Sequence, residues 1–209
     1  MDHVPGTVQY RLNDQLGMVA AVMAAPQFVL VTNLDWPDQP RQSVTHYLAA
    51  AVVEASFDGQ HYHVAALRSV NIMLARQAVA MHLPSQPPSW IEFELSNEQA
   101  REAVADPRPQ RLSQWGVPAS SAAAFAQALQ PGQSRASVQV MPVVYGRVGT
   151  VQRVRVLYAD PIGTMPGEHA AWLAVPVIGG RVRLIPASIG HLAEAVRTFL
   201  PQASSVHHG

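Results

Sequence analysis

The feature that most constrains the fold of this chain is a set of strand-like runs joined by short turns that contain glycine. Asp58-Gly59, Gly146 to Gly149 and Gly179-Gly180 each separate two runs rich in apolar and β-branched residues. Tight turns of the Asp-Gly type need positive φ angles, which glycine adopts readily, and they join neighbouring antiparallel strands. The sequence therefore predicts an antiparallel sheet built from hairpins.

Helices are expected between and after these hairpins. The hairpin strands are predicted at residues 45–57 with 60–67, 135–145 with 151–160, and 171–178 with 181–185. Apolar residues recur at helical spacing over residues 13–25, 69–83, 118–129 and 188–200. Ser96-Asn-Glu-Gln99 has the spacing of a capping box, so another helix should begin there. Hairpins joined by helices indicate an α+β fold rather than a doubly wound parallel sheet.

The length of 209 residues favours a single domain, residues 1–209. Two hairpin-then-helix units, Thr45 to Leu83 and Arg135 to Leu200, indicate two loosely similar lobes. We place the lobes at about 13–105 and about 106–201, with the first lobe incomplete. Residues 202–209 are predicted to form a polar tail.

Composition excludes several kinds of chemistry. All 14 basic residues are arginine, 14 acidic residues balance them, and there is no lysine or cysteine. Without cysteine there is no disulfide, thiolate nucleophile or Cys-based metal site. Without lysine there is no Gly-Lys-Ser/Thr phosphate loop and no Schiff base. Because no Gly-x-Ser-x-Gly or Gly-x-Gly string occurs either, we predict no catalytic residue, no cofactor and no metal.

The sequence also gives an expectation about location. The segment from Met1 to Leu16 lacks the basic region and apolar core of an export signal. No apolar run reaches the roughly 18 residues of a membrane span. We therefore expect a cytoplasmic protein that binds no membrane.

A histidine pair supplies one alternative function. His61 and His63 lie two apart on a predicted strand, so they would project from one face and could ligate a metal together with His46 or Glu54. The same spacing is found on ordinary half-exposed strands, and no His-Glu-x-x-His string accompanies it. A small metal-dependent enzyme is therefore an alternative hypothesis.

A carboxylate pair has a similar double interpretation. Glu92 and Glu94 alternate with apolar residues and share one strand face, as a general acid and base pair would. Such alternation is also typical of a solvent-facing strand. We favour the solvent-facing interpretation.

Arginines alternate with apolar residues on two of the predicted strands. Arg153 and Arg155 share one strand face, and so do Arg181 and Arg183. If these strands are neighbours, four guanidiniums would line one face of the sheet, either solvated or against an acidic protein surface or nucleic acid. No aromatic residues interleave them as in common RNA-binding sheets, so we expect no nucleic-acid partner. A nucleic-acid or small-molecule binding module remains an alternative hypothesis.

Several segments, taken in order, carry a resemblance to a known family. They are Leu112-Ser-Gln-Trp-Gly-Val-Pro118 with the helix that follows, Asp160 and Gly163 in Asp-x-x-Gly, Trp172, and Pro186-Ala-Ser-x-x-His-Leu192. In this order they resemble the EspG family, the cytosolic chaperones of mycobacterial and related type VII (ESX) secretion. The resemblance covers about Leu16 to Leu200. Because family members carry a further strand and helix at the front, the chain looks like a shortened member.

The resemblance implies a fold and a function. It implies an EspG-like α+β fold and a non-enzymatic chaperone that binds the helical tip of the PPE subunit in a PE/PPE heterodimer, keeping it soluble for export. In the family the central sheet and the C-terminal helical region bind the partner, which here are Arg135 to Ile185 and Ser188 to Leu200. We therefore expect partner contacts at Arg153, Arg155, Leu192, Val196 and Phe199.

Overall fold

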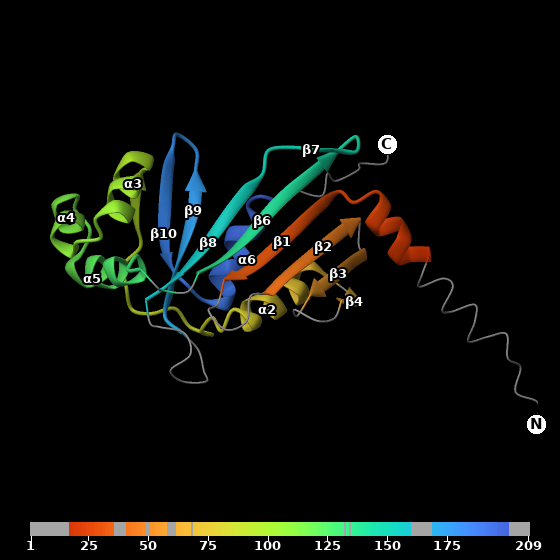
Figure 1. The fold of residues 1–209 in the computed structure, drawn as a ribbon, viewed down its shortest axis with the longest axis horizontal. Coiled ribbons are helices and arrows are strands. Elements are labelled where there is room, and N and C mark those ends of the chain that lie inside the picture. The colour runs from red at the N-terminus through yellow and green to blue at the C-terminus, as the bar shows by residue number, and fades with distance from the viewer. Residues whose placement is uncertain are drawn as a thin grey trace, which may run out of the picture.

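The computed structural model describes residues 17–35, 41–48, 51–57, 62–67, 69–131, 133, 135–159 and 169–200. In this part of the chain ten strands form one sheet, and every neighbouring pair is antiparallel (Figure 1). Across the sheet the order is β4 (Tyr62–Leu67), β3 (Ala51–Phe57), β2 (Arg41–Leu48), β1 (Phe28–Asp35), β6 (Arg135–Val144), β8 (Gln152–Tyr158), β9 (Ala171–Val177), β10 (Arg181–Pro186) and β5 (Phe93–Ser96). The short β7 (Arg147–Val148) pairs with β6 at its tip.

The strand order is symmetric about its centre. β1 to β4 form one meander and β6, β8, β9 and β10 form another, and the two meet where β1 pairs with β6. Each meander is followed by a helix, α2 (Val70–Ala80) after β4 and α6 (Ile189–Arg197) after β10. The two helices contact each other, and the Arg197 guanidinium donates to the Asn71 side chain at 2.9 Å.

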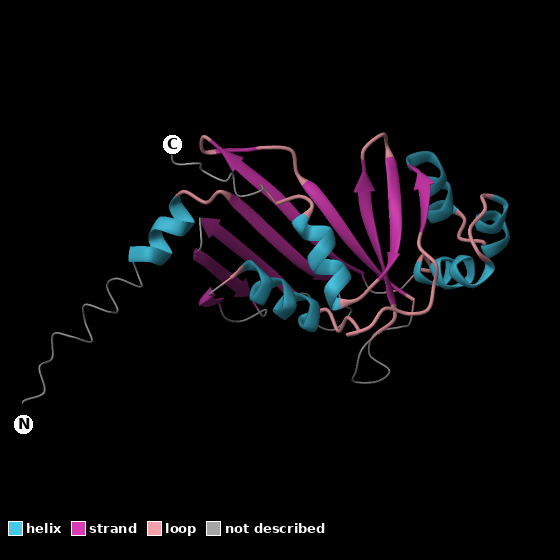
Figure 2. Ribbon diagram, turned by 180° about the vertical axis from the view of Figure 1, so that it is seen from behind, coloured by secondary structure: helices cyan, strands magenta, loops and turns pink. Residues whose placement is uncertain are grey.

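Helices cover the two faces of the sheet unequally. α2 and α6 lie across the back face (Figure 2). The helices α3 (Asn97–Ala105), α4 (Pro109–Gln114) and α5 (Ala119–Ala128) gather at the β10 and β5 end, and a helix at residues 17–24 lies near the opposite end. No described helix covers the middle of the front face (Figure 1). None of the helices in the described ranges is long and apolar enough to traverse a bilayer.

The main hydrophobic core lies between the back of the sheet and the helix pair α2 and α6. It includes Leu30 of β1, Val138 of β6, Leu74 of α2 and Leu192 of α6, all almost fully buried. Both halves of the chain therefore share one core. Tyr158 reinforces it, because its buried hydroxyl donates to the Met81 carbonyl at the end of α2 at 2.7 Å.

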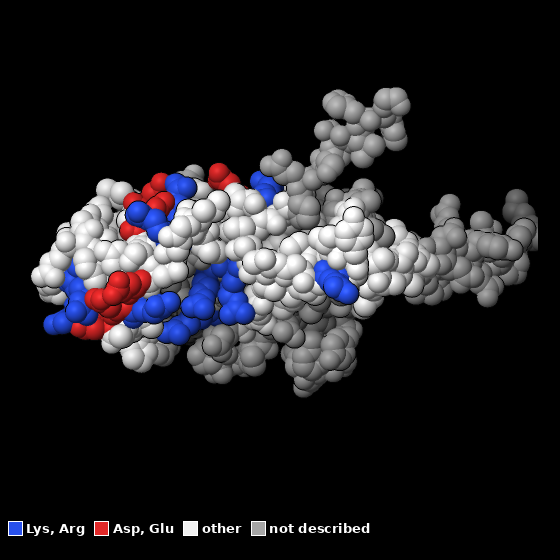
Figure 3. All heavy atoms as spheres, turned by 90° about the horizontal axis from the view of Figure 1, so that it is seen from above, with Lys and Arg blue, Asp and Glu red and all other residues white. Residues whose placement is uncertain are grey.

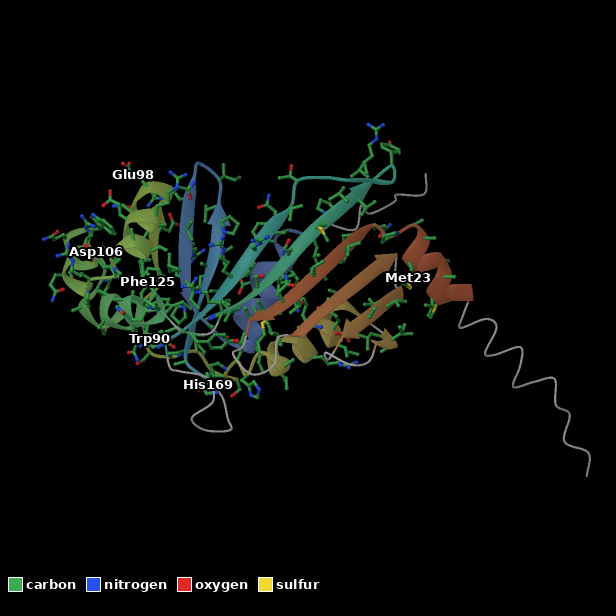
Figure 4. The ribbon with its side chains drawn as sticks, viewed as in Figure 1. Met23, Trp90, Glu98, Asp106, Phe125 and His169 are labelled. Carbon is green, nitrogen blue, oxygen red and sulfur yellow. The ribbon has the colours of Figure 1, made fainter. Side chains whose placement is uncertain are left out.

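A second core holds the helical end against the front of the sheet. Trp172 of β9 is fully buried there, stacks on Trp90 with ring centroids 4.9 Å apart, and meets Phe93 and Phe125 edge to face. Figure 4 labels Trp90 and Phe125 in this region. Two interactions position α3. The preceding strand β5 pairs with β10, and the backbone N–H of Asn97 donates to the Gly180 carbonyl at 2.9 Å.

The α+β class and the antiparallel sheet of hairpins with flanking helices are confirmed, as is the capping box at Ser96. The prediction of one strand over residues 45–57 is wrong, because this stretch contributes to two antiparallel strands, β2 and β3, in which Leu48 lies opposite Ala51. The division into lobes at residues 105 and 106 stays a prediction; β5 and α3, which precede that boundary, adjoin β10 of the second meander.

The hydrogen bond between the two halves gives a test of this core. Tyr158→Phe leaves the Met81 carbonyl without this donor in a buried site, so we expect it to lower the free energy of unfolding by about 1–3 kcal/mol. Tyr145→Phe is the matched control, because that side chain is fully exposed, and it should change stability by less than about 0.5 kcal/mol. Urea unfolding measures both, and equal stability of the two variants would contradict a stabilising role for the Tyr158 hydroxyl.

Candidate partner-binding groove

A groove of about 1130 Å³ lies on the front of the sheet, where the helical end meets the second meander. Strands β6, β8, β9 and β10 form its floor, and α3 and α5 contribute to its walls. Its accessible apolar lining includes Val104 and Val151, which are exposed, and Val182, which is half-buried. Phe125, Leu129, Leu157 and Leu184 also border the groove but are buried in the second core. Four arginines and several uncharged polar side chains complete the lining, so the groove combines apolar surface with positive charge.

Strand register places Arg153 and Arg155 in this groove. Arg155 lies opposite Ser137 of β6 on one side and Ala174 of β9 on the other. Ala174 in turn lies opposite Leu184 of β10, so these residues share one row and one face. Arg153, two residues away on β8, points to the same face.

The expected face of four arginines on neighbouring strands is corrected by this register. Arg183 pairs with Val175 rather than with Ala174, so Arg181 and Arg183 lie on the back face. There the Arg183 guanidinium contacts Glu92 at 2.5 Å and the Arg181 guanidinium contacts Glu94 at 3.0 Å. The hydrogen bond to Glu92 raises the pKa of Arg183, with burial acting in the opposite direction. Glu92 and Glu94 thus form ion pairs at the sheet surface.

Two arginines from other elements join Arg153 and Arg155. Arg135 comes from β6 and Arg101 from α3, and all four line the groove. Within the described ranges none of the four forms an ion pair. Figure 3 shows arginines gathered beside the end of the molecule that holds α3, α4 and α5. We name these four residues the arginine cluster.

Acidic residues near the groove lie on another side of α3. The helix lines the groove with Asn97, Ala100, Arg101 and Val104, which is the spacing of one helix face. Glu98 and Glu102 each follow a groove-lining residue by one position, about 100° further around the helix. Glu102 also faces Arg111 of α4 at 3.8 Å, and Figure 4 shows Glu98 at the outer end of α3. No described residue that lines the groove is acidic.

The other expected contact residues lie on the far side of the sheet. Leu192 and Val196 are 0% exposed in the main core, so their apolar spacing serves packing within the chain and not partner contact. Phe199 is half-buried against the same core, and its role at a partner surface stays a prediction. Arg153 and Arg155 are exposed in the groove.

The histidine hypothesis gains no geometric support from the described residues. His61 and the side chains of His46 and His63 lie outside them. Glu54 is buried under α2, where it accepts a hydrogen bond from Gln77 and lies 3.6 Å from the Arg76 guanidinium. No group of three metal-ligating side chains occurs in the part of the chain that the structure describes.

Comparison with solved structures assigns the fold to the type seen in chaperones of type VII secretion. The chain matches EspG5 of Mycobacterium tuberculosis, a type VII secretion system chaperone solved in complex with a PE25–PPE41 dimer, with a TM-score of 0.69. Sequence identity is 17%, and the match covers 93% of this chain and 83% of that chain. No protein-family model and no curated protein matches the sequence. The resemblance to EspG is thus confirmed as a likeness of fold.

The buried position of Leu192 leads to a test of its role. Leu192→Ala should lower the free energy of unfolding by about 2–5 kcal/mol, because it removes a fully buried side chain from the main core. Ile178→Ala truncates a side chain that is 97% exposed at the β9–β10 turn and should change stability by less than about 0.5 kcal/mol. Denaturant unfolding compares the two, and a Leu192→Ala protein as stable as wild type would argue against this core position.

The arginine cluster forms no ion pair with the described residues, so we expect its removal to leave stability unchanged. The double variant Arg153→Gln, Arg155→Gln should unfold within about 0.5 kcal/mol of wild type, or slightly above it because like charges are removed. Arg147→Gln on β7 is a control outside the groove lining. Thermal unfolding at low ionic strength measures both. A loss of more than about 1 kcal/mol in the double variant alone would mean that these arginines have a partner within the chain.

Proposed function

We propose that this protein is a cytosolic chaperone or adaptor of type VII secretion, which binds the helical tip of a PPE-type subunit in a PE/PPE pair and keeps it soluble for export. The observation that carries the proposal is the match in fold, over 93% of the chain, to a chaperone solved together with a PE/PPE dimer. Arg153 and Arg155 are the proposed partner contacts.

The surface of the protein supports a protein partner. The groove is lined by apolar residues and by arginines that form no ion pair with the described residues. Protein interfaces favour this composition, because arginine is weakly hydrated and bonds in a planar fork. It adjoins the middle of the front face, which no described helix covers. A client with an apolar helical tip would gain from a receiving surface that shields it from water.

Co-expression with a PE/PPE pair tests the proposal. We expect a PE/PPE pair encoded in the same gene neighbourhood to co-elute with this protein in size-exclusion chromatography and to be more soluble with it than without it. The matched control is the same pair with the apolar residues at the PPE tip replaced by serine, which should abolish co-elution because burial of apolar surface drives the contact. A soluble, intact pair that passes through the column separately from the folded protein would refute the proposed function.

A further inference from the structure

The arginine cluster defines the chemistry of the partner more narrowly. We propose that the groove binds the acidic face of a client helix, with Arg153 and Arg155 contacting two carboxylates one helical turn apart. For the helical nature of the client the proposal rests on the proposed function, whereas the requirement for carboxylates follows from this chain alone. Four exposed cations converge on one groove, and no acidic residue in the described lining neutralises them.

The spacing of the two arginines suits a helix. Arg153 and Arg155 are two residues apart on one strand, so their attachment points lie about 7 Å from each other on the same face. Side chains three or four residues apart on a helix have Cβ atoms about 5–6 Å apart. Two glutamates in this arrangement can therefore each meet one guanidinium. Arginine also binds carboxylates through two parallel hydrogen bonds, which favours this pairing.

The rest of the lining suits the apolar side of an amphipathic helix. Val104 of α3 and Val151, just before β8, are exposed apolar residues of the lining, and Val182 of β10 is half-buried there. Acidic and apolar side chains on adjacent faces of one helix would fill both parts of the groove.

The distribution of charge favours an acidic protein over nucleic acid. Nucleic-acid binding surfaces carry an extended basic stripe and usually a basic excess, because many phosphates must be neutralised. This chain has equal numbers of acidic and basic residues. The neighbouring surface of α3 carries Glu98 and Glu102, which would repel a phosphate backbone that continued past the groove. A short acidic segment avoids that repulsion.

Three labelled peptides of about 20 residues test the carboxylate requirement by fluorescence anisotropy with the full chain. The first is an amphipathic helix with leucines on one face and glutamate pairs at i and i+4 beside them. The second has glutamine in place of every glutamate. The third keeps the composition of the first but places the glutamates at i and i+2. We expect the first peptide to bind at least about tenfold more tightly than the other two, with an advantage that shrinks as salt rises from about 50 to about 500 mM.

Variants of the protein assign the effect to the groove. Arg153→Gln with Arg155→Gln should remove the preference for the first peptide, whereas Arg147→Gln should keep it. The unfolding measurement given above for the same variants verifies that they are folded. No binding of the first peptide, equal binding of the glutamate and glutamine peptides, or equally tight binding of a single-stranded oligonucleotide of the same length overturns the inference.

The PE/PPE pair separates this inference from the proposed function. If wild-type protein and the double variant capture the pair equally well, the inference about the groove is overturned, whereas the proposed chaperone function stands without Arg153 and Arg155 as contacts. If wild type captures no PE/PPE pair yet binds the first peptide in an arginine-dependent way, the proposed function is lost and the carboxylate chemistry of the groove is supported.

Discussion

The antiparallel pairing of β1 with β6 is the interaction on which the rest of the structure depends. It joins two meanders, each with its own helix, into one sheet. Because the meanders are joined, α2 and α6 lie side by side on the back face and bury a common core. The same join places Asn33 of β1 at the border of the groove, beside residues of β6 and β8. The main core and the groove therefore lie on opposite faces of the same sheet.

Local sequence signals predicted the parts of this fold that local interactions determine. Glycine turns, helical spacing and the Ser96 capping box each act within a few residues, so the hairpins and helices could be located. The pairing of β1 with β6 and of β10 with β5 links distant segments, and periodicity carries no information about such partners. The single strand expected over residues 45–57 is wrong because no glycine in the sequence marks the boundary between Leu48 of β2 and Ala51 of β3.

In the candidate site, too, local sequence signals predicted only those features that depend on neighbouring residues. Alternation correctly indicated that Arg153 and Arg155 share a face, but it could not place Arg183 relative to them, because a one-residue change of register exchanges the two faces of a strand. Arg101 could not be predicted as a groove residue, because α3 reaches the groove through the long-range pairing of β5 with β10. Leu192 was misassigned because a helix shows the same apolar spacing whether it faces a core or a partner. Four converging cations that form no ion pair with any described residue add little to stability, which is typical of a surface kept for function.

The pairing of β1 with β6 also affects how the chain folds while it is being synthesised on the ribosome. The paired residues of the two strands are far apart in the sequence. Asp35 and Arg135 are separated by 100 positions, and Phe28 and Pro142 by 114. At typical rates of synthesis, β6 leaves the ribosome roughly 5 to 20 seconds after β1. During that interval the first meander has an open strand edge, which can pair with other nascent chains. Slow closure of long-range strand pairs is a general property of such topologies, so a protein with this fold is itself exposed to misassembly until its second half has been made.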